Sequence, residues 1–416
     1  MVSLFRTKRF GMFIHWGLYS IRGWHEQEQW RYPVESKQYQ SYMKQFYPKK
    51  YDPNAWVTAA KQAGMDYICF TTKHHDGFCM WDTAYSDYKI TNTPYGKDVL
   101  KELAEACRKQ GMALSLYYSV PDWHHKNYPN FGRSHELARP KQGDEPDEDK
   151  YIEYVKRQVT ELLSFYGPIL SFFWDIPPER KDPSVNELVR SLQPGILINN
   201  RGYDQGDFST PEREVPQSGR FETLTEACQS VGRQSWGYRS NEDYYSHSFL
   251  IASIDQMMAR GGNYVLNVGP NADGEIPPDA LETLRAVGNW YQRVKEALYA
   301  QPAPDLLPEN DFLVTKYNHT LYLHFPKAPE AAGIFLAAIK KAPKSALVLN
   351  DQTPLNVSFD QMPTLCSPPN HCGPVLHINK IPVNRFAHET IVLKLEFEDL
   401  DQALDQDYEV KSENRF

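Results

Sequence analysis

Apolar runs with β-forming residues alternate with segments of helical periodicity between residues 10 and 299. Segment 66–72 is rich in β-branched and aromatic side chains, whereas 98–111 spaces its apolar residues three and four apart. Strands are expected at 11–17, 66–72, 112–119, 168–175, 195–201, 221–230 and 263–268, and helices at 54–64, 98–111, 150–165, 183–192, 247–260 and 278–299. Right-handed crossovers make such a sheet parallel, so the pattern predicts an α/β fold of the TIM-like (β/α) barrel type. A full count of eight units is an inference, because the helical signals weaken in the second half.

The character of the sequence changes after Gln301-Pro-Ala-Pro304. Short strand-like runs such as 320–325 and 390–397 are separated there by Pro, Asn, Asp and Gly, which is typical of a small antiparallel β domain. The residues after 400 are mostly acidic and polar, as in a solvated tail. We therefore expect a barrel at 1–302, an antiparallel β-sandwich at 303–400 and an acidic tail at 401–416.

Charge and length narrow the range of partners. The 416 residues carry a formal net charge of −8, which disfavours a nucleic-acid partner because such binding needs a basic face. No apolar run is long enough to cross a bilayer, so no membrane partner is expected. The chain enters its first strand pattern soon after Met1, without the apolar core of a signal peptide, and we expect a cytoplasmic protein. The oligomeric state stays open, a homo-oligomer included.

The six cysteines are scattered along the chain and show no CxxC spacing. Four of them lie in apolar patterns, which is typical of free buried thiols in a reducing compartment. Cys366 and Cys372 bracket Ser-Pro-Pro-Asn-His, so a disulfide or a metal site can be considered there. Neither is predicted.

One predicted strand, Ser171-Phe-Phe-Trp-Asp175, ends in a single carboxylate. In a parallel β/α fold the side chains at the C-terminal ends of the strands form the active site, and an acid there has no packing role. Asp175 is therefore a candidate catalytic nucleophile. A helix N-cap or a loop aspartate is the alternative interpretation, and the other strand ends have to decide between them.

Polar and aromatic residues gather at those other strand ends as well. The first strand ends at His15, and the second runs into Lys73-His-His-Asp-Gly-Phe78 with Trp81 close behind. The third ends in Tyr117-Tyr-Ser119, and the fifth runs into Arg201. Groups that hydrogen-bond hydroxyls, together with aromatic faces that cover C–H surface, are typical of a sugar pocket.

The adjacent pair His74-His75 also raises the question of a metal. Neighbouring residues of a regular strand face opposite sides, so both can line one pocket only where the strand leaves its pleat. A zinc site needs further ligands, and no HExxH spacing is present. We predict no metal. Taken alone, His15 is equally compatible with a satisfied core histidine.

The motifs together resemble the α-L-fucosidases of glycoside hydrolase family 29. The resemblance covers Phe10-Gly-Met-Phe-Ile-His-Trp-Gly17, Thr72-Lys-His-His-Asp-Gly-Phe78, Asp175, Ser235-Trp-Gly-Tyr238 and Gly261-Gly-Asn-Tyr-Val-Leu-Asn-Val-Gly-Pro-Asn-Ala-Asp-Gly274. These motifs occur in order and at plausible spacing over the whole predicted barrel. The C-terminal segment matches only in character, as the small β-sandwich of this family.

The resemblance implies a cofactor-independent retaining exo-α-L-fucosidase that acts on a fucosylated oligosaccharide or glycoconjugate. Asp175 falls on the position of the nucleophile, and Arg201 is expected close to it. The family's sugar-binding positions, with Trp81 added from its strand end, are His15, His74, His75 and Tyr118 for hydroxyls and Trp30, Phe13 and Trp236 for apolar surface. The family motif often has Glu immediately before the tryptophan at position 30. This chain has Gln29 there, so that contact is uncharged.

Retaining hydrolysis also requires a second carboxyl group, roughly 5–5.5 Å from the nucleophile. Glu212 resembles the family glutamate that follows an Asp-Phe-x-Thr pattern, and we favour it as the acid/base residue. Glu226, ten residues before Trp236, resembles another family glutamate and is the alternative. A raised pKa is needed to keep the acid protonated near neutral pH.

Two other functions stay open at this point. A catalytically inactive, lectin-like barrel would bind fucose without turnover. A retaining glycosidase for another sugar, such as galactose, would share the two carboxylates but accept different hydroxyls. The presence of Asp175 argues against the first alternative, and the complete motif series argues against the second.

Overall fold

The computed structural model describes residues 2–32, 34–138, 141–215, 219–307, 311–360 and 374–405. Cys366, Cys372 and the tail from residue 406 lie outside these ranges. The chain divides into two compact units. Unit 1 comprises Met1–Glu214, Thr223–Tyr245 and Asn263–Arg285, and unit 2 comprises Val215–Glu222, Ser246–Gly262 and Ala286–Phe416.

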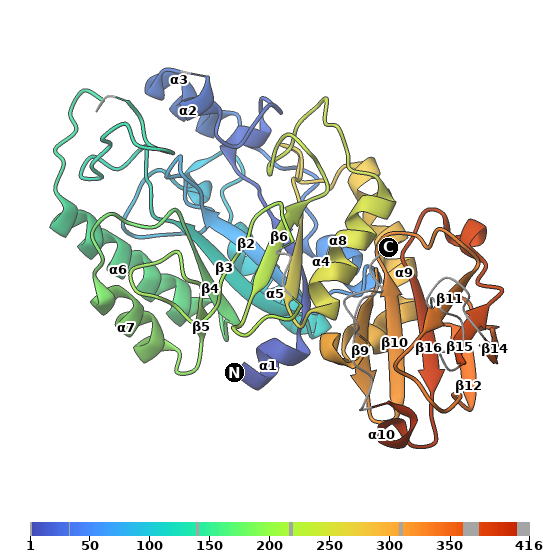
Figure 1. Ribbon diagram of the computed structural model, residues 1–416. Helices are drawn as coiled ribbons and strands as arrows, with labels where there is room; N and C mark the ends of the chain where they lie inside the picture. Colours follow the sequence, from blue (N-terminus) through green and yellow to red (C-terminus); the bar gives the residue numbers. More distant parts are fainter. Residues whose placement is uncertain are drawn as a thin grey trace. The chain divides into compact units, whose positions relative to one another are not determined.

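Unit 1 is built on a seven-stranded parallel sheet with the order β5-β4-β3-β2-β1-β7-β6 (Figure 1). The strands are β1 (Phe10–Ile14), β2 (Tyr67–Lys73), β3 (Ala113–Ser119), β4 (Ser171–Asp175), β5 (Leu197–Ile198), β6 (Glu226–Ser230) and β7 (Asn263–Val268). Each predicted strand is present and all pairings are parallel, although β5 and β6 are shorter than expected. The register sets Ser119 beside Asp175, so these strands end at the same edge.

The sheet is not closed by a regular eighth strand. Within the described residues, no ladder joins β5 to β6. The segment 207–213 instead makes single parallel bridges, from Phe208 to Asn199 on one side and from Ser209 and Glu212 to Thr225 and Cys228 on the other. The observed architecture is thus an open, curved parallel sheet with an irregular segment between its outer strands.

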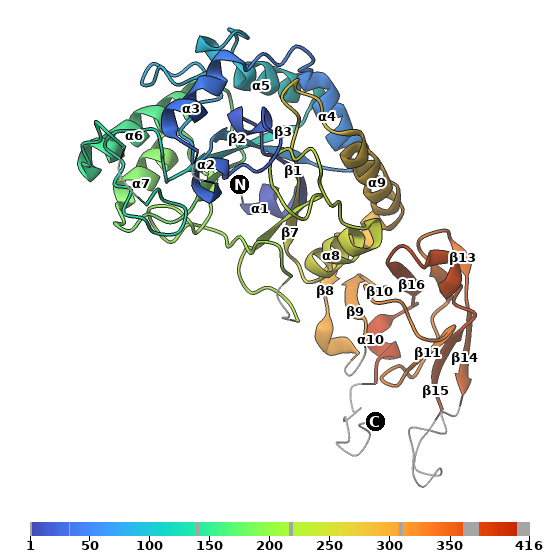
Figure 2. The same ribbon diagram turned by 90° about the horizontal axis from the view of Figure 1, so that it is seen from above.

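Four helices lie around the outside of this sheet (Figure 2). They are α4 (Pro53–Gln62), α5 (Val99–Gln110), α6 (Glu148–Phe165) and α7 (Pro183–Leu192). Each begins after an aspartate whose carboxylate accepts hydrogen bonds from backbone N–H groups of the first turn, namely Asp52, Asp98, Asp147 and Asp182. At the other end of α5, Gly111 has φ +69°, a conformation that favours glycine. Local sequence signals therefore determine where all four helices begin and where α5 ends.

Side chains from the strands of unit 1 meet in an apolar cluster. Its members are Phe13, Tyr67, Cys69, Tyr117, Leu170, Phe173, Cys228 and Val265. A β-carbon at Gly11 would lie 2.3 Å from the Tyr67 ring, so this ring fills the interior only because position 11 has no side chain. As predicted for free thiols, Cys69, Cys79, Cys107 and Cys228 are unpaired and buried.

The shorter helices of unit 1 are α1 (Val2–Thr7), α2 (Glu28–Arg31) and α3 (Ser36–Gln40). Helix α9 (Pro278–Leu298) begins in unit 1, whereas α8 (His247–Ala259) and α10 (Leu400–Ala403) belong to unit 2. None of the described helices combines the length and the hydrophobicity that a bilayer-spanning segment needs.

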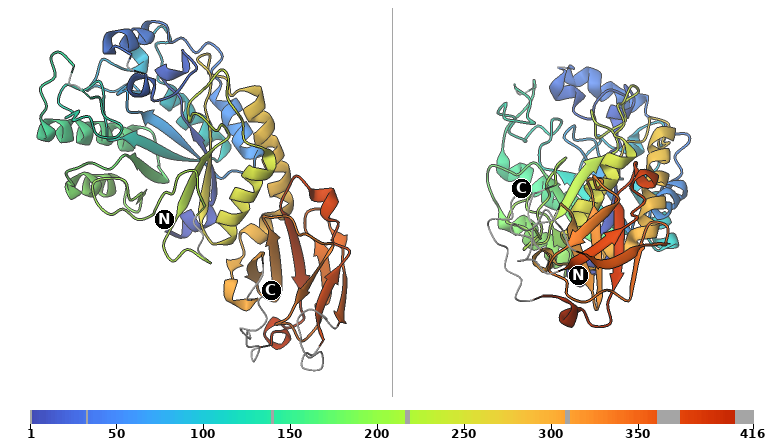
Figure 3. Two further views of the ribbon diagram at one scale, coloured as in Figure 1. Left: turned by 45° about the horizontal axis from the view of Figure 1, so that its top comes forward. Right: turned by 45° about the vertical axis from the view of Figure 1, so that its right-hand side comes forward.

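Unit 2 contains two antiparallel sheets (Figure 3). The six-stranded sheet has the order β13-β12-β16-β10-β9-β8, and the three-stranded sheet has the order β11-β15-β14. Their strands are β8 (Gln301–Pro302), β9 (Leu313–Tyr317), β10 (Thr320–Phe325), β11 (Gly333–Leu336), β12 (Ser345–Val348), β13 (Thr353–Pro354), β14 (Asn356–Asp360), β15 (Val375–Asn379) and β16 (Ile391–Glu396). Leu323 and Leu393 of the first sheet share one apolar cluster with Leu376 and Ile378 of the second, as a sandwich requires. The boundary at residue 302 stays a prediction.

Candidate active site

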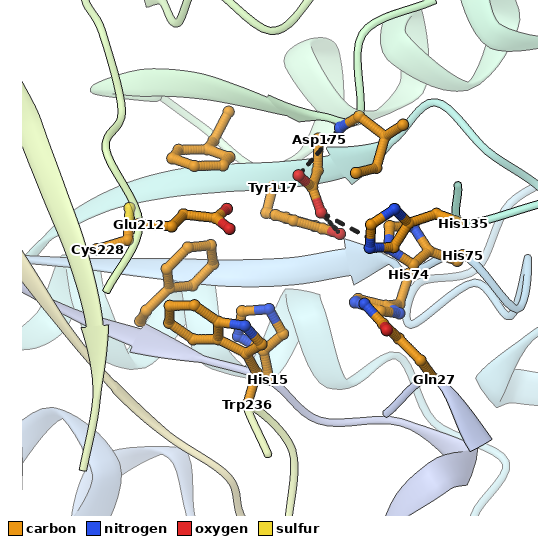
Figure 4. Close-up of a pocket in the computed structure, with 13 residues that line it drawn as sticks. His15, Gln27, His74, His75, Tyr117, His135, Asp175, Glu212, Cys228 and Trp236 are labelled. Carbon is orange, nitrogen blue, oxygen red and sulfur yellow. Dashed lines mark hydrogen bonds and ion pairs between the residues drawn. The ribbon is translucent and has the colours of Figure 1, made fainter. Parts of the chain in front are cut away.

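A pocket of unit 1 lies where the parallel strands end (Figure 4). The space outside the protein atoms here is about 450 Å³, part of which is open to solvent. Its lining residues are Phe13, His15, Gln27, His74, His75, Tyr117, His135, Phe173, Asp175, Ile176, Glu212, Cys228 and Trp236. Residues from distant parts of the sequence, including seven predicted sugar-binding or catalytic positions, thus converge on one cavity.

Asp175, the last residue of β4, is held by donors on both carboxylate oxygens. Oδ2 accepts a 2.7 Å hydrogen bond from the Tyr117 hydroxyl. Oδ1 accepts hydrogen bonds from Arg201 Nη1 at 3.2 Å and from the backbone N–H of Ile176 at 3.0 Å. The side chain is only 13% exposed, so these contacts fix its orientation toward the pocket.

The charge state of Asp175 follows from the same neighbours. Burial alone would raise the pKa of this carboxyl, but the Arg201 guanidinium and the Tyr117 hydrogen bond lower it. Asp175 is therefore ionised near neutral pH, as a carboxylate nucleophile must be. The next residue, Ile176, has φ +56°, which is costly for a β-branched side chain and is characteristic of functional sites.

Glu212 lies on the irregular segment that bridges β5 and β6. The backbone N–H of Arg213 donates to Cys228 O at 2.9 Å, which anchors this segment to β6. The Glu212 carboxylate pairs with Arg201 Nη1, the same nitrogen that contacts Asp175. Its side chain is 40% exposed, and burial together with the negative charge of Asp175 raises its pKa despite Arg201. The two carboxyl groups therefore have opposite pKa shifts around one guanidinium.

Three imidazoles form one wall of the pocket. His15 follows β1, and its Nδ1 lies 2.6 Å from Asn267 Oδ1. Nδ1 of His75 lies 2.6 Å from Ser119 Oγ, and its Nε2 lies 3.8 Å from Asp175 Oδ2. Nδ1 of His74 is buried without a hydrogen-bond partner among the described residues. Burial lowers the pKa of all three, that of His75 to about 4, so the imidazoles are neutral near pH 7.

Both His74 and His75 reach the pocket because β2 ends irregularly. The pairing of β2 with β3 shifts register between Thr71 and Lys73, immediately before the two histidines. A departure from the pleat is what the sequence required for adjacent side chains to share a cavity.

Aromatic surface comes from Phe13, Phe173 and Trp236. The Trp236 indole stacks on His15 at a ring separation of 5.4 Å. The turn that carries it is held by the buried carboxylate of Glu26. Glu26 Oε2 accepts hydrogen bonds from Ser235 Oγ at 2.6 Å and from the backbone N–H groups of Trp236 at 2.9 Å and Gly237 at 3.2 Å.

Tyr118 does not lie in the pocket, contrary to the prediction. Its hydroxyl donates to Gln158 Oε1 at 2.7 Å on the opposite face of β3, and Lys73 Nζ lies 4.3 Å from its ring centre. Successive residues of a strand alternate between faces, so Tyr117 occupies the pocket instead.

Four other predicted residues also lie outside the pocket lining, and one of them, Arg201, still contacts Asp175 and Glu212. Trp81 is buried and its Nε1 donates to Glu161 Oε2 at 3.1 Å. Trp30 stacks on His135 at 5.1 Å and so supports a lining residue from behind. Glu226 starts β6, at the opposite end of the strands, where its buried carboxyl is paired with the Tyr67 hydroxyl. The structure thus leaves Glu212 as the carboxyl beside Asp175.

Several lining residues carry no signal in the sequence that identifies them. His135 comes from the long connection between β3 and α6, and has φ +64°. Gln27 lines the pocket, whereas the amide of Gln29 donates to Ser36 Oγ at 3.1 Å instead of reaching the cavity. Loop residues of this kind have no periodicity that predicts their direction.

His74, His75 and Asp175 are also the one group of possible metal ligands within the described ranges, with ligand atoms within 4.8 Å of one another. The carboxylate of this group already accepts hydrogen bonds from Tyr117, Ile176 and Arg201. A guanidinium in contact with the carboxylate disfavours a second cation there. The donor set therefore suits a hydroxyl-bearing ligand better than a metal.

Comparisons with known proteins agree with this site. A family model described as alpha-L-fucosidase matches residues 1–296. The structure of α-L-fucosidase isoenzyme 1 from Paenibacillus thiaminolyticus is 34% identical, with a TM-score of 0.85 over 96% of this chain and 99% of that chain. An α-L-fucosidase from Bacteroides thetaiotaomicron, a covalent intermediate trapped with 2-fluoro-fucosyl fluoride, is 26% identical, with a TM-score of 0.77 over 94% of each chain.

A mammalian α-L-fucosidase is also similar to this chain over most of the length of both proteins. The tissue α-L-fucosidase of Bos taurus is 29% identical over 367 residues, which are 78% of this chain and 75% of that protein. Because the family model spans well over half of the chain, the chain belongs to the α-L-fucosidase family and is a glycoside hydrolase.

Proposed function

We propose that Asp175 is the nucleophile and Glu212 the general acid/base of a retaining exo-α-L-fucosidase. The observation that carries this assignment is the arrangement around Arg201. Nη1 of this guanidinium contacts both carboxylates, and the pKa of Asp175 is lowered while that of Glu212 is raised. Two carboxyl groups with divergent pKa values are the pair that double displacement at a glycoside needs.

In the first step, a carboxylate oxygen of Asp175 attacks the anomeric carbon of the fucose. The bond from that carbon to the leaving oxygen breaks, and the leaving oxygen takes the proton of Glu212. The products are a fucosyl ester on Asp175, an ionised Glu212 and the free alcohol. In the second step Glu212 removes a proton from water, the resulting oxygen attacks the anomeric carbon, and the ester bond breaks to restore ionised Asp175.

The change of Glu212 from acid to base follows from its surroundings. The negative charge of Asp175 is one of the causes that raise the pKa of Glu212. When Asp175 becomes an ester it loses this charge, whereas Arg201 keeps its positive charge beside Glu212. The pKa of Glu212 therefore falls in the intermediate, which favours the carboxylate that activates water.

The substrate class and the complete architecture belong to the same proposal. The enzyme acts on terminal α-L-fucose of an oligosaccharide or glycoconjugate, in keeping with the covalent fucosyl intermediate of the Bacteroides thetaiotaomicron relative. The segment 207–213 takes the place of the eighth strand of a TIM-like barrel, because it hydrogen-bonds to the ends of both β5 and β6. Unit 2 then supplies the β-sandwich.

The test is the release of 4-nitrophenol from 4-nitrophenyl α-L-fucoside, with and without azide. Asp175→Ala should be inactive, and azide should restore release and give the inverted β-L-fucosyl azide. Glu212→Ala should still release 4-nitrophenol once, because this leaving group needs no proton, and azide should then give the α-L-fucosyl azide with retention. Glu214→Ala is the matched control, since Glu214 is an exposed carboxylate on the same segment.

Two results would contradict the assignment. If Glu212→Ala turns over like the Glu214→Ala control while Glu226→Ala is impaired, the acid/base role belongs to Glu226. If the wild type binds fucose but releases no 4-nitrophenol, the pocket is a fucose-binding site without hydrolase activity.

A further inference from the structure

The proton on His75 can be located from its hydrogen-bond partners. Ser119 Oγ lies 2.6 Å from His75 Nδ1 and 2.8 Å from the carbonyl oxygen of Pro121. A serine hydroxyl has one hydrogen, and a carbonyl oxygen can only accept. Ser119 therefore donates to Pro121, and its oxygen accepts the hydrogen of His75 Nδ1. In the neutral imidazole this leaves Nε2 without a proton.

The same reasoning applies to His15. Asn267 Nδ2 donates to the carbonyl oxygen of Trp236 at 2.6 Å and to Ser230 Oγ at 3.0 Å, which identifies the nitrogen end of the amide. The other end, Oδ1, can only accept, and it lies 2.6 Å from His15 Nδ1. Nδ1 of His15 therefore carries the hydrogen, and Nε2 is again an acceptor.

We propose that Ser119 and Asn267 are positioning residues that hold His75 and His15 as Nδ1–H tautomers, so that each presents an unprotonated Nε2 to a hydroxyl group of the bound sugar. The inference rests on the proposed function, because it states which groups of the same pocket accept hydrogen bonds from the sugar. Neither residue touches the reacting atoms. They determine instead that the two histidines accept hydrogen bonds and do not donate them.

The distance between His75 and Asp175 agrees with an unprotonated Nε2 on His75. His75 Nε2 and Asp175 Oδ2 are 3.8 Å apart, which is too far for a hydrogen bond. With the tautomer fixed, both atoms are acceptors and neither can satisfy the other. A hydroxyl that donates its hydrogen there removes the conflict, whereas hydrogen or fluorine in its place does not. The pocket therefore selects a ligand by its hydroxyl donors.

His74 lacks such a fixed tautomer. Its buried Nδ1 has no hydrogen-bond partner among the described residues, although its ring stacks on Tyr117 at 5.7 Å. His74 can therefore protonate either nitrogen when a ligand enters. Of the three imidazoles that follow β1 and β2, two thus have a fixed tautomer and one can adapt to the ligand.

Nuclear magnetic resonance tests the proposal directly, on the intact enzyme labelled with ¹⁵N-histidine. Long-range ¹H–¹⁵N spectra at neutral pH distinguish a protonated ring nitrogen from an unprotonated one, and His75→Gln and His15→Gln identify the two signals by their loss. The expected result is an unprotonated Nε2 on both rings. A protonated Nε2 on either ring in the free wild type would overturn the proposal for that residue.

Ser119→Ala removes the acceptor that fixes His75. We expect the His75 proton to move to Nε2, on the side that faces Asp175, and kcat/KM to fall about tenfold or more through KM. Ser115→Ala is the matched control, because Ser115 is a buried serine on the same strand whose oxygen accepts from Ser171 Oγ at 2.7 Å and contacts no histidine. It should leave the tautomer unchanged and kcat/KM within about twofold. A loss equal in both variants, with the His75 signal unmoved, would leave Ser119 a purely structural residue.

Asn267→Asp provides an independent measurement. A carboxylate beside Nδ1 raises the pKa of His15, so its Nε2 becomes a donor at lower pH. The loss of kcat/KM relative to wild type should therefore be larger at pH 6 than at pH 8, and the ¹⁵N signal should report imidazolium over the same range. A loss that does not depend on pH would contradict the role of Asn267. Because the spectra need no substrate, they distinguish failure of this proposal from failure of the fucosidase assignment, which wild-type turnover reports.

Discussion

Lys73 and Asp122 form an ion pair in which Nζ and Oδ2 are 2.8 Å apart and neither side chain is more than 1% exposed. Lys73 immediately precedes the two pocket histidines, and Asp122 lies in the connection that follows β3. Asp122 Oδ1 also accepts the backbone N–H groups of His124 at 2.9 Å and His125 at 2.8 Å. The pair thus joins the end of β2 to the loop that later supplies His135.

Asp122→Ala leaves the Lys73 ammonium buried without a negatively charged partner, with the Tyr151 hydroxyl at 3.1 Å as its remaining hydrogen-bond acceptor. We expect a loss of about 3–5 kcal/mol in the free energy of unfolding, measured by urea denaturation at neutral pH. Lys126→Ala is the control, since Lys126 and Glu145 form a 2.9 Å pair with both side chains exposed, and such a pair contributes at most about 1 kcal/mol. Equal losses in the two variants would show that burial of the pair has no effect on stability.

The pH dependence of kcat/KM should be bell-shaped. It falls in acid as Asp175 takes up a proton, and it falls in alkali as Glu212, whose pKa is raised by burial and by Asp175, loses one. A fucosylated oligosaccharide is the suitable substrate, because its poor leaving group needs the proton. In Glu212→Gln the alkaline limb should disappear from the residual activity on 4-nitrophenyl α-L-fucoside. Its persistence in that variant and its loss in Glu226→Gln would reverse the assignment.

Glu226 should make the protein less stable as the pH rises. Burial raises the pKa of its carboxyl to about 7, above the value of about 4.3 in an unfolded chain. The folded state therefore binds the extra proton between these pH values, and this contribution is complete below pH 4.3 and lost above pH 7. Relative to Glu226→Gln, the wild type should lose on the order of 4 kcal/mol of unfolding free energy across this window, at about 1.4 kcal/mol per pKa unit.

The comparison needs urea denaturation of both proteins at several pH values. Glu214→Gln serves as the control for an exposed carboxyl in the same region. If the wild type and Glu226→Gln show parallel pH profiles, the Glu226 carboxyl is not protonated in the folded protein.

Glu26→Ala should weaken substrate binding without removing a catalytic group. Its Oε2 holds Ser235 and the turn at Trp236, and the indole covers His15. We expect KM to rise severalfold with a smaller change in kcat, because apolar surface contributes to binding in the ground state as well as in the transition state. Glu26→Gln keeps an acceptor oxygen for the turn and should lie between wild type and Glu26→Ala. A drop in kcat alone would contradict this role.

The sequence was sufficient for the parallel sheet and for most of the pocket, for a physical reason. His15 and Asp175 are polar residues at the C-terminal ends of apolar strands. Strands that alternate with helices run parallel, so these ends meet at one edge of the sheet. The break after Thr71 similarly allowed both His74 and His75 to face inward. These are local properties of the chain.

The face of a strand to which a given side chain points, and the conformation of a loop, do not follow from the local sequence in this way. Tyr117 and Tyr118 are identical neighbours, and only the pleat of the folded β3 decides which of them faces Asp175. Trp81, also a predicted site residue, comes eight residues after β2 ends, and its loop turns it into the core against Glu161. His135 lies in a long connection whose course depends on contacts such as the 2.8 Å hydrogen bond from Trp123 Nε1 to its carbonyl oxygen. Such contacts exist only after folding.

The segment 207–213 differs from its neighbours in how it is attached. Asp175 ends a strand that pairs with β3 over several residues. Glu212 lies on a segment that contacts its neighbours through isolated β-bridges. A shortened, lengthened or exchanged segment can therefore move the proton donor without breaking any ladder on which the nucleophile depends. The Arg201 guanidinium is the link that remains, because it contacts Asp175, Glu212 and the Thr210 carbonyl oxygen, so a redesigned segment has to keep Arg201 in place for Asp175 to stay oriented.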